Sequence, residues 1–133
     1  MKVKKTRGAV YHTTYHIVFC PKYRRKVLVG EIAEYLRGLF KSMIRKRGWE
    51  LISLEVRPDH IHIFLEGVDP KYSPSDVVKY LKGVSGLALF RKFSKLREQF
   101  KNGRLWSRSY YVGTAGEVSA ETIKRYIERV EHE

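Results

Sequence analysis

The chain has very little cysteine and no long apolar run, which argues against a disulfide-stabilised protein and against a membrane-spanning one. The single cysteine, Cys20, cannot form an intramolecular disulfide, so nothing in the sequence requires an oxidising compartment. No apolar stretch reaches the roughly 18–20 residues that span a bilayer. The basic N-terminus is not followed by the apolar segment and cleavage site of a secretory signal. We therefore expect a cytoplasmic protein with no membrane association.

Acidic residues are also scarce, and this imbalance indicates a polyanionic partner. The chain has 27 Lys and Arg but 14 Asp and Glu, a formal net charge of +13. Residues 1–30 contain no acidic side chain, and in residues 79–104 the only one is Glu98. Basic clusters bind phosphates, and aromatic side chains between them can stack on unpaired bases. A solvated charged surface is the alternative for either cluster alone. The candidate DNA contacts are Lys22, Arg24, Arg25, Lys26, Arg91 and Lys92.

Apolar periodicity predicts a single α+β domain over residues 1–133. The predicted strands are residues 11–20, 49–56, 60–66 and 105–112. The predicted helices are residues 30–47, a segment capped by Ser73 with Val77, Leu81, Val84 and Ala88 on its apolar face, and a C-terminal segment capped by Ser119. This β-α-β-β-α-β order is that of a ferredoxin-like split βαβ fold with an antiparallel sheet. Residues 1–112 are expected to form that core, and residues 113–133 a hinge and the C-terminal helix.

The most specific local pattern is Asp59-His60-Ile61-His62. Residues two apart in a strand point to the same face, so both imidazoles are expected to project together while Ile61 enters the core. Two neighbouring neutral imidazoles can bind a divalent metal. For an isolated His-x-His pattern, a pair of hydrogen-bonded surface histidines is the alternative.

The turn before this pair predicts a third ligand. If Pro58-Asp59 forms a two-residue hairpin loop, Glu55 lies directly opposite His62 on the same sheet face. Glu55 then completes a set of two histidines and one carboxylate, which suits Mg or Mn. A shift of one residue in the register would turn Glu55 to the other face. An exposed Glu paired with a basic residue is the alternative.

Six segments, in order along nearly the whole chain, resemble one family. They are residues 15–19 (YHIVF), 21–26 (PKYRRK), 58–62 (PDHIH), 80–83 (YLKG), 105–107 (LWS) and 122–128 (TIKRYIE). The chain resembles the small single-tyrosine transposases of the HUH class, named for two histidines that flank a hydrophobic residue. These proteins mobilise compact bacterial and archaeal insertion sequences as single strands.

The resemblance implies a chemistry for three residues. His60 and His62 match the metal-binding pair, and Tyr126 in the C-terminal helix matches the nucleophile. Such an enzyme cleaves and rejoins single-stranded DNA through a 5′-phosphotyrosine link, assisted by a divalent metal. Periodicity alone places Tyr126 on an apolar helix stripe, where a packed core tyrosine is the usual case. A non-catalytic hairpin-binding protein of the same fold is the alternative to an enzyme.

The resemblance also implies an assembly and reveals one departure. Family members are homodimers that bind DNA hairpins, and the tyrosine helix can pack against the partner's histidines. Gly113 and Gly116 precede that helix and are candidate hinges. One turn after the tyrosine, the family usually has a polar residue, often Gln, that reaches the metal, but this chain has Val130. Glu55, Glu131 or the DNA would have to supply that ligand, and the predicted register favours Glu55.

Overall fold

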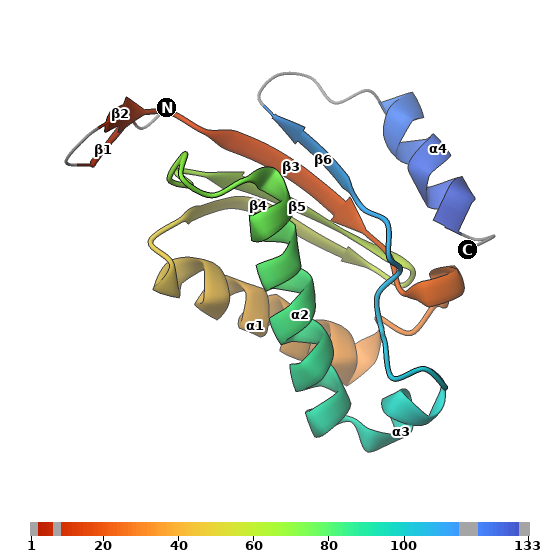
Figure 1. The fold of residues 1–133 in the computed structure, drawn as a ribbon. Helices are drawn as coiled ribbons and strands as arrows, with labels where there is room; N and C mark the ends of the chain where they lie inside the picture. The colour runs from red at the N-terminus through yellow and green to blue at the C-terminus, as the bar shows by residue number, and fades with distance from the viewer. Residues whose placement is uncertain (1–2, 7–8, 115–119, 131–133) are drawn as a thin grey trace.

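A four-stranded antiparallel sheet runs through the centre of the protein, and helices pack on both of its faces (Figure 1). The computed structural model describes residues 3–6, 9–114 and 120–130. In spatial order the strands are β4 (Glu50–Arg57), β5 (His60–Glu66), β3 (Thr14–Phe19) and β6 (Tyr111–Thr114). Helix α1 (Gly30–Lys46) follows β3 in the chain, and α2 (Pro74–Lys92) follows β5. This topology confirms the predicted ferredoxin-like α+β fold.

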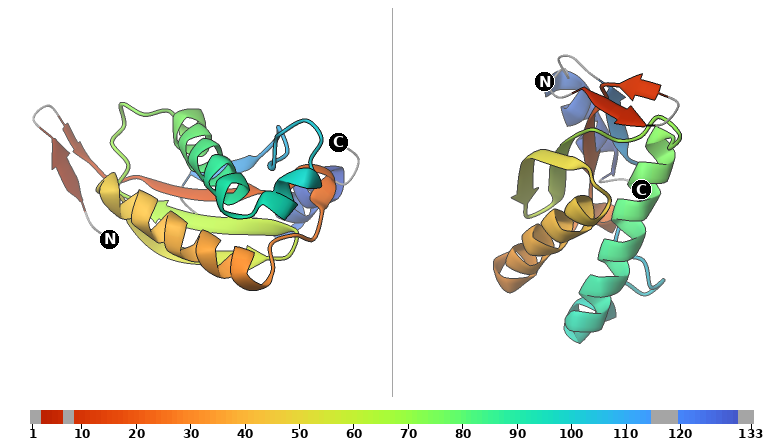
Figure 2. Two further views of the ribbon diagram at one scale, coloured as in Figure 1. Left: turned by 90° about the horizontal axis from the view of Figure 1, so that it is seen from below. Right: turned by 90° about the vertical axis from the view of Figure 1, so that its left-hand side faces the viewer.

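Alternation along the two central strands separates a core face from a second face. The core side chains of these strands, which pack with α1 and α2, are Tyr15, Ile17, Phe19, Ile61, Ile63 and Leu65. Figure 2 shows α1 and α2 together on this side of the sheet. The opposite face, called the site face below, presents His16, Val18, Cys20, His60 and His62. Helix α4 (Ala120–Val130) packs on the site face, because its Tyr126 and Val130 form a small apolar cluster with Val18 and Cys20.

Two helix ends have recognisable capping signals, one of them the predicted cap Ser73. Gly48, just after α1, has a φ of +74°, a left-handed conformation that glycine adopts without a steric penalty. At the start of α2, the Ser73 side chain accepts a hydrogen bond from the Asp76 backbone, and the Asp76 carboxylate accepts one from the Ser73 backbone. This reciprocal capping box satisfies two backbone N–H groups that the helix itself cannot bond.

The predicted apolar face of α2 is wrong in its C-terminal half. Val84 is exposed, whereas Ser85 is completely buried together with Leu81 and Leu89. Ser85 is buried because its hydroxyl donates to the Leu81 carbonyl at 2.6 Å and accepts the Trp106 indole N–H at 3.0 Å. A hydrogen-bonded polar side chain can occupy a core position that hydrophobic periodicity assigns to an apolar residue.

The fourth strand is shorter and later than predicted. It begins at Tyr111, and around Trp106 the chain forms only an isolated bridge to Pro21. Leu105 and Trp106 are buried in the main core, so their apolar character reflects packing rather than strand pairing. Gly113, a predicted hinge, lies within β6 opposite His16.

Four short elements were not predicted from the sequence. They are β1 (Lys4–Thr6), β2 (Ala9–Tyr11), the 3-10 turn η1 (Lys22–Arg24) and α3 (Ser94–Glu98). The predicted cap Ser119, the hinge Gly116 and the alternative ligand Glu131 lie outside the described residues. Across the described ranges, no helix combines the length and apolar character that crossing a membrane requires.

Candidate functional site

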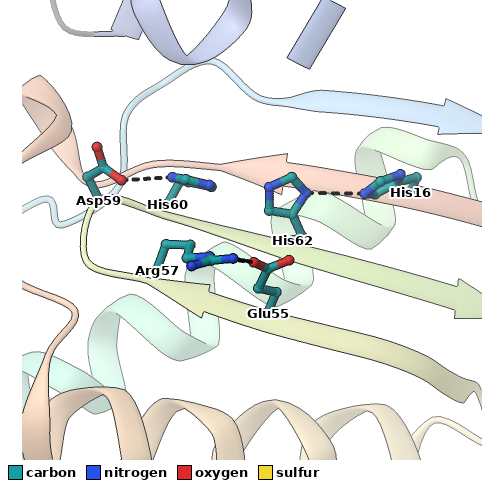
Figure 3. Close-up of polar contacts among 6 residues, drawn as sticks. All are labelled: His16, Glu55, Arg57, Asp59, His60 and His62. Carbon is teal, nitrogen blue, oxygen red and sulfur yellow. Dashed lines mark hydrogen bonds and ion pairs between the residues drawn. The ribbon is translucent and has the colours of Figure 1, made fainter. Parts of the chain in front are cut away.

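The β4–β5 hairpin has the predicted register. Pro58 and Asp59 form its two-residue loop, Arg57 pairs with His60, and Glu55 pairs with His62. Directly opposed residues lie on the same face, so these side chains gather on the site face of the sheet, as Figure 3 shows. The turn therefore sets which side chains surround the histidine pair.

His60 and His62 stand side by side on β5. Their ring centroids are 5.0 Å apart, with the rings tilted by 69°. Burial and then the neighbouring His60 lower the pKa of His62 to about 4. His62 is therefore a neutral imidazole near pH 7, which is the form that binds metals.

An acidic and a basic side chain hold His60 in place. The Nδ1–H of His60 donates to Asp59 Oδ1 at 2.8 Å, and Arg24 Nε contacts Asp59 Oδ2 at 2.9 Å. Burial alone would raise the pKa of Asp59, but its interactions with His60 and Arg24 outweigh that effect and lower the pKa. A carboxylate bonded to Nδ1 leaves Nε2 of His60 as the lone-pair donor, an arrangement common around metal-bound histidines.

His16 is a site residue that the sequence did not identify as one. Its Nε2 shares a hydrogen bond with Nδ1 of His62 at 3.3 Å, and their ring centroids are 5.5 Å apart (Figure 3). Burial lowers the pKa of His16. The contact arises because β3 pairs with β5, so that Val18 lies opposite His62 and His16 lies diagonally across. The sequence does indicate that His16 and Val18 point to the same face of one strand, since they are two residues apart. It does not indicate that this strand lies beside β5, so the contact with His62 could not be predicted.

Glu55 lies where the register predicted, but its carboxylate is engaged with Arg57. The Arg57 guanidinium donates to Glu55 Oε1 and forms an ion pair with it (Figure 3). In the part of the chain that the structure describes, no three His, Cys, Asp or Glu side chains form a metal-ligand group. The role of Glu55 as a third ligand stays a prediction.

Tyr126 reaches the site face from α4. Its side chain is 6% exposed and packs against Val18, and its hydroxyl donates to the Ser109 carbonyl at 3.0 Å. Val18 is the direct cross-strand neighbour of His62. Tyr126 and His62 therefore both border Val18 on one face of the sheet. Val130 is fully buried in the same cluster, where its side chain offers no ligand atom.

The candidate DNA contacts divide into two groups. Lys22, Arg24, Arg25 and Lys26 lie in and just after η1, and Arg91 and Lys92 lie in the last turn of α2. Within the first group, Arg24 binds Asp59, while Arg25 donates to the Gln99 carbonyl. In the second group, Lys92 lies over the Tyr35 ring at 5.3 Å.

The lowered pKa of His62 has a consequence for stability. Between pH 6.5, the ordinary value, and about 4, the unfolded chain binds a proton that the folded protein excludes. We expect the free energy of unfolding of the metal-free protein to fall as the pH drops through this window. Urea unfolding in chelator at pH 7.5, 6 and 5 measures it. A His62→Phe variant should show a shallower dependence, and equal slopes would contradict the assignment.

Comparison with known proteins identifies close relatives. A family model described as "Transposase IS200 like" matches residues 9–130. The ISDra2 transposase TnpA of Deinococcus radiodurans is 40% identical over 128 residues, covering 96% of this chain and 91% of the relative. The transposase for insertion sequence element IS200 of Salmonella typhimurium is 38% identical over 117 residues, covering 88% of this chain and 76% of the relative.

Solved structures have the same fold. A putative transposase from Deinococcus radiodurans superimposes with a TM-score of 0.85 at 39% identity, covering 96% of this chain and 97% of the other. A REP-associated tyrosine transposase bound to a REP hairpin gives a TM-score of 0.57 at 16% identity, covering 96% and 69%. The second likeness extends to the fold alone.

Proposed function

Because the chain belongs to the IS200-like transposase family, we propose that it cleaves and rejoins single-stranded DNA at insertion-sequence ends, with Tyr126 as nucleophile. One observation carries the proposal: Tyr126 and His62 border the same residue, Val18, on the site face. A nucleophile and a pair of imidazoles on one sheet face are the groups that this chemistry requires.

Tyr126 performs the covalent step in this proposal. Its phenolic oxygen, after losing its proton, attacks the scissile phosphorus. A Tyr126–phosphorus bond forms, the bond to the 3′ oxygen breaks, and that oxygen takes up a proton to become a 3′-OH. Rejoining reverses the exchange when a 3′-OH attacks the phosphotyrosine. One phosphoester replaces another at each stage, so strand transfer needs no ATP.

Two cations flank the tyrosine and suit the phosphate. Arg125 and Arg129 line a pocket of about 290 Å³ beside Tyr126, and the Arg129 guanidinium lies 5.9 Å from the centre of the Tyr126 ring. Guanidinium groups bind phosphate oxygens through paired hydrogen bonds. They would orient the scissile phosphate and favour the phenolate.

The histidine pair fits a divalent cation such as Mg or Mn. Two features support this assignment: the lowered pKa of His62 and the Asp59 bond that leaves Nε2 of His60 available. Glu55, once released from Arg57, or a DNA phosphate would complete the ligands. A cation there would polarise the scissile phosphate and offset the charge that develops in the transition state.

The proposal is tested by incubating the protein with labelled single-stranded DNA from an insertion-sequence end. Reactions contain Mg or Mn, or chelator, and are separated on a denaturing gel. We expect a covalent protein–DNA adduct and a shortened strand only when metal is present. DNA binding without an adduct in either metal would contradict the enzymatic proposal.

The Asp59 contact gives a further expected result. Asp59→Asn keeps the shape of the side chain but removes the charge that holds His60 and pairs with Arg24. We expect the affinity for Mn to fall roughly 10- to 100-fold, as for other changes to groups that orient ligands. Isothermal titration calorimetry measures this affinity. Asp69→Asn is the matched control, since Asp69 accepts a turn hydrogen bond from Lys71. Equal affinities in the two variants would exclude the orienting role.

We also propose that the chain acts as a homodimer on DNA with hairpins, with the tyrosine helix shared between subunits. The charge of +13 supports a DNA partner. The structure described for the more distant relative contains a REP hairpin.

A second candidate function is hairpin binding without catalysis. It is favoured by Val130, a buried apolar side chain at the position where related enzymes usually have a polar one. The adduct assay above separates the two candidates, because a binding protein forms no covalent product.

A further inference from the structure

A basic pocket outside the histidine site lies between η1 and the chain that follows α3. Its volume is about 500 Å³, within the range of ligand pockets. The lining side chains that matter here are Lys22, Tyr23, Arg25, Phe100, Lys101 and Arg104. Four of these six are basic, and none of the residues that line the pocket is acidic.

Main-chain contacts hold the two walls of the pocket together. The Lys22 N–H donates to the Leu105 carbonyl at 2.8 Å. The adjacent residues, Pro21 and Trp106, form an isolated antiparallel β-bridge. The Arg25 guanidinium also connects the two segments, because it donates to the Gln99 carbonyl. These hydrogen bonds connect the two walls of the pocket.

Within the pocket, an arginine lies between two aromatic rings. The Arg25 guanidinium carbon is 5.5 Å from the centre of the Tyr23 ring and 5.0 Å from that of Phe100. Phe100 is buried, whereas Tyr23 is 49% exposed. An exposed aromatic ring beside a planar guanidinium is a stacking surface for a base.

The Tyr23 ring is held in position by a strained backbone conformation. Tyr23 and Arg24 have φ values of +58° and +55°, a left-handed conformation that bulky residues rarely adopt. Two consecutive strained residues persist only where the surrounding structure holds them, and such sites are often functional. Here the same turn directs Tyr23 into the pocket and Arg24 toward Asp59.

We propose that this pocket binds one unpaired nucleotide of the DNA substrate, an inference that rests on the proposed function for the identity of the strand. The base stacks on Tyr23 beside Arg25, and the phosphate binds Lys101 and Arg104. Neutral peptides would leave the basic side chains unmatched, and a lone inorganic anion would not use the aromatic surface. The η1 turn thus contributes Tyr23 to this pocket and Arg24 to the contact with Asp59, which holds His60.

The base contact is tested with two probes in chelator, so that no cleavage occurs. Fluorescence anisotropy compares a labelled 15-nucleotide thymidylate with the same backbone lacking bases. We expect the wild-type protein to prefer the thymidylate by roughly tenfold, the value of one stacked base. Tyr23→Asn should lose most of this preference. Asn tolerates the left-handed backbone, so the variant is expected to fold. Tyr23→Phe should keep the preference, and an undiminished preference in Tyr23→Asn would overturn the proposal.

The phosphate contact is tested with the same two probes. Lys101→Gln should weaken both probes by a similar factor and lower the salt dependence of binding, because a phosphate contact is independent of the base. Lys41→Gln is the control, because it removes the same charge at an exposed position of α1. If Lys101→Gln and Lys41→Gln bind alike, the phosphate assignment is wrong. Since this assay requires neither metal nor adduct, its failure is distinct from a failure of the proposed cleavage activity.

Discussion

Replacing Tyr126 by Phe should abolish the covalent adduct and reduce cleavage on the order of 10³-fold or more, because no other group would attack the phosphorus from that position. The variant should still fold. Phe retains the packing against Val18 and Val130, and the loss of the hydrogen bond to Ser109 costs roughly 1 kcal/mol. The denaturing-gel assay measures the adduct, and anisotropy should show DNA affinity within about twofold of the wild type.

Tyr111→Phe is the matched control for this experiment. Tyr111 packs against the same small cluster and lines the same pocket as Tyr126, but it comes from β6. It should form the adduct normally. An adduct that persists in Tyr126→Phe and disappears in Tyr111→Phe would transfer the nucleophilic role to the strand tyrosine.

Replacing His62 by Ala should have the second largest effect. We expect Mn affinity and cleavage to fall by more than the roughly 10- to 100-fold typical of residues that only orient a ligand. The reason is that His62 is the half-buried, neutral imidazole of the pair, and its loss also leaves His16 without its hydrogen-bond partner. Calorimetry with Mn and the adduct gel measure the two effects separately.

His12→Ala is the control for the loss of an imidazole. His12 lies 3.9 Å from Glu66 instead of beside the His60–His62 pair. Its removal should leave Mn binding and adduct formation within about twofold of the wild type. Cleavage by His62→Ala within tenfold of the wild-type rate would show that His62 is dispensable.

Local patterns in the sequence predicted the hairpin that carries the histidines, because a two-residue loop leaves one register available. The opposition of Glu55 and His62 followed from that loop alone. The same reasoning could not find His16, since its contact with His62 spans 46 residues and depends on β3 lying beside β5. Strand order is a tertiary property that alternation within a strand does not encode.

Two further contacts could not be found from local patterns for the same reason. Arg24 stays a predicted DNA contact, but its ion pair with Asp59 depends on the fold bringing that residue to it. Ser85 was not among the predicted core positions of α2, but the fold brings the Trp106 indole to its hydroxyl. The charge and polarity of a residue do not predict its environment when its hydrogen-bond or ion-pair partner comes from a distant segment of the chain.

The double pairing of β5 determines where conformational entropy is lost. β5 is hydrogen-bonded to β4 on one side and to β3 on the other, so His60 and His62 are ordered when the protein folds. Binding of an ion or a DNA strand therefore requires little further ordering of these rings. In the proposed reaction, the ordering cost would instead fall on α4, which meets the sheet through a small cluster around Val18 and a hydrogen bond to Ser109. A substitution in that cluster would then change the reaction rate without altering the histidines.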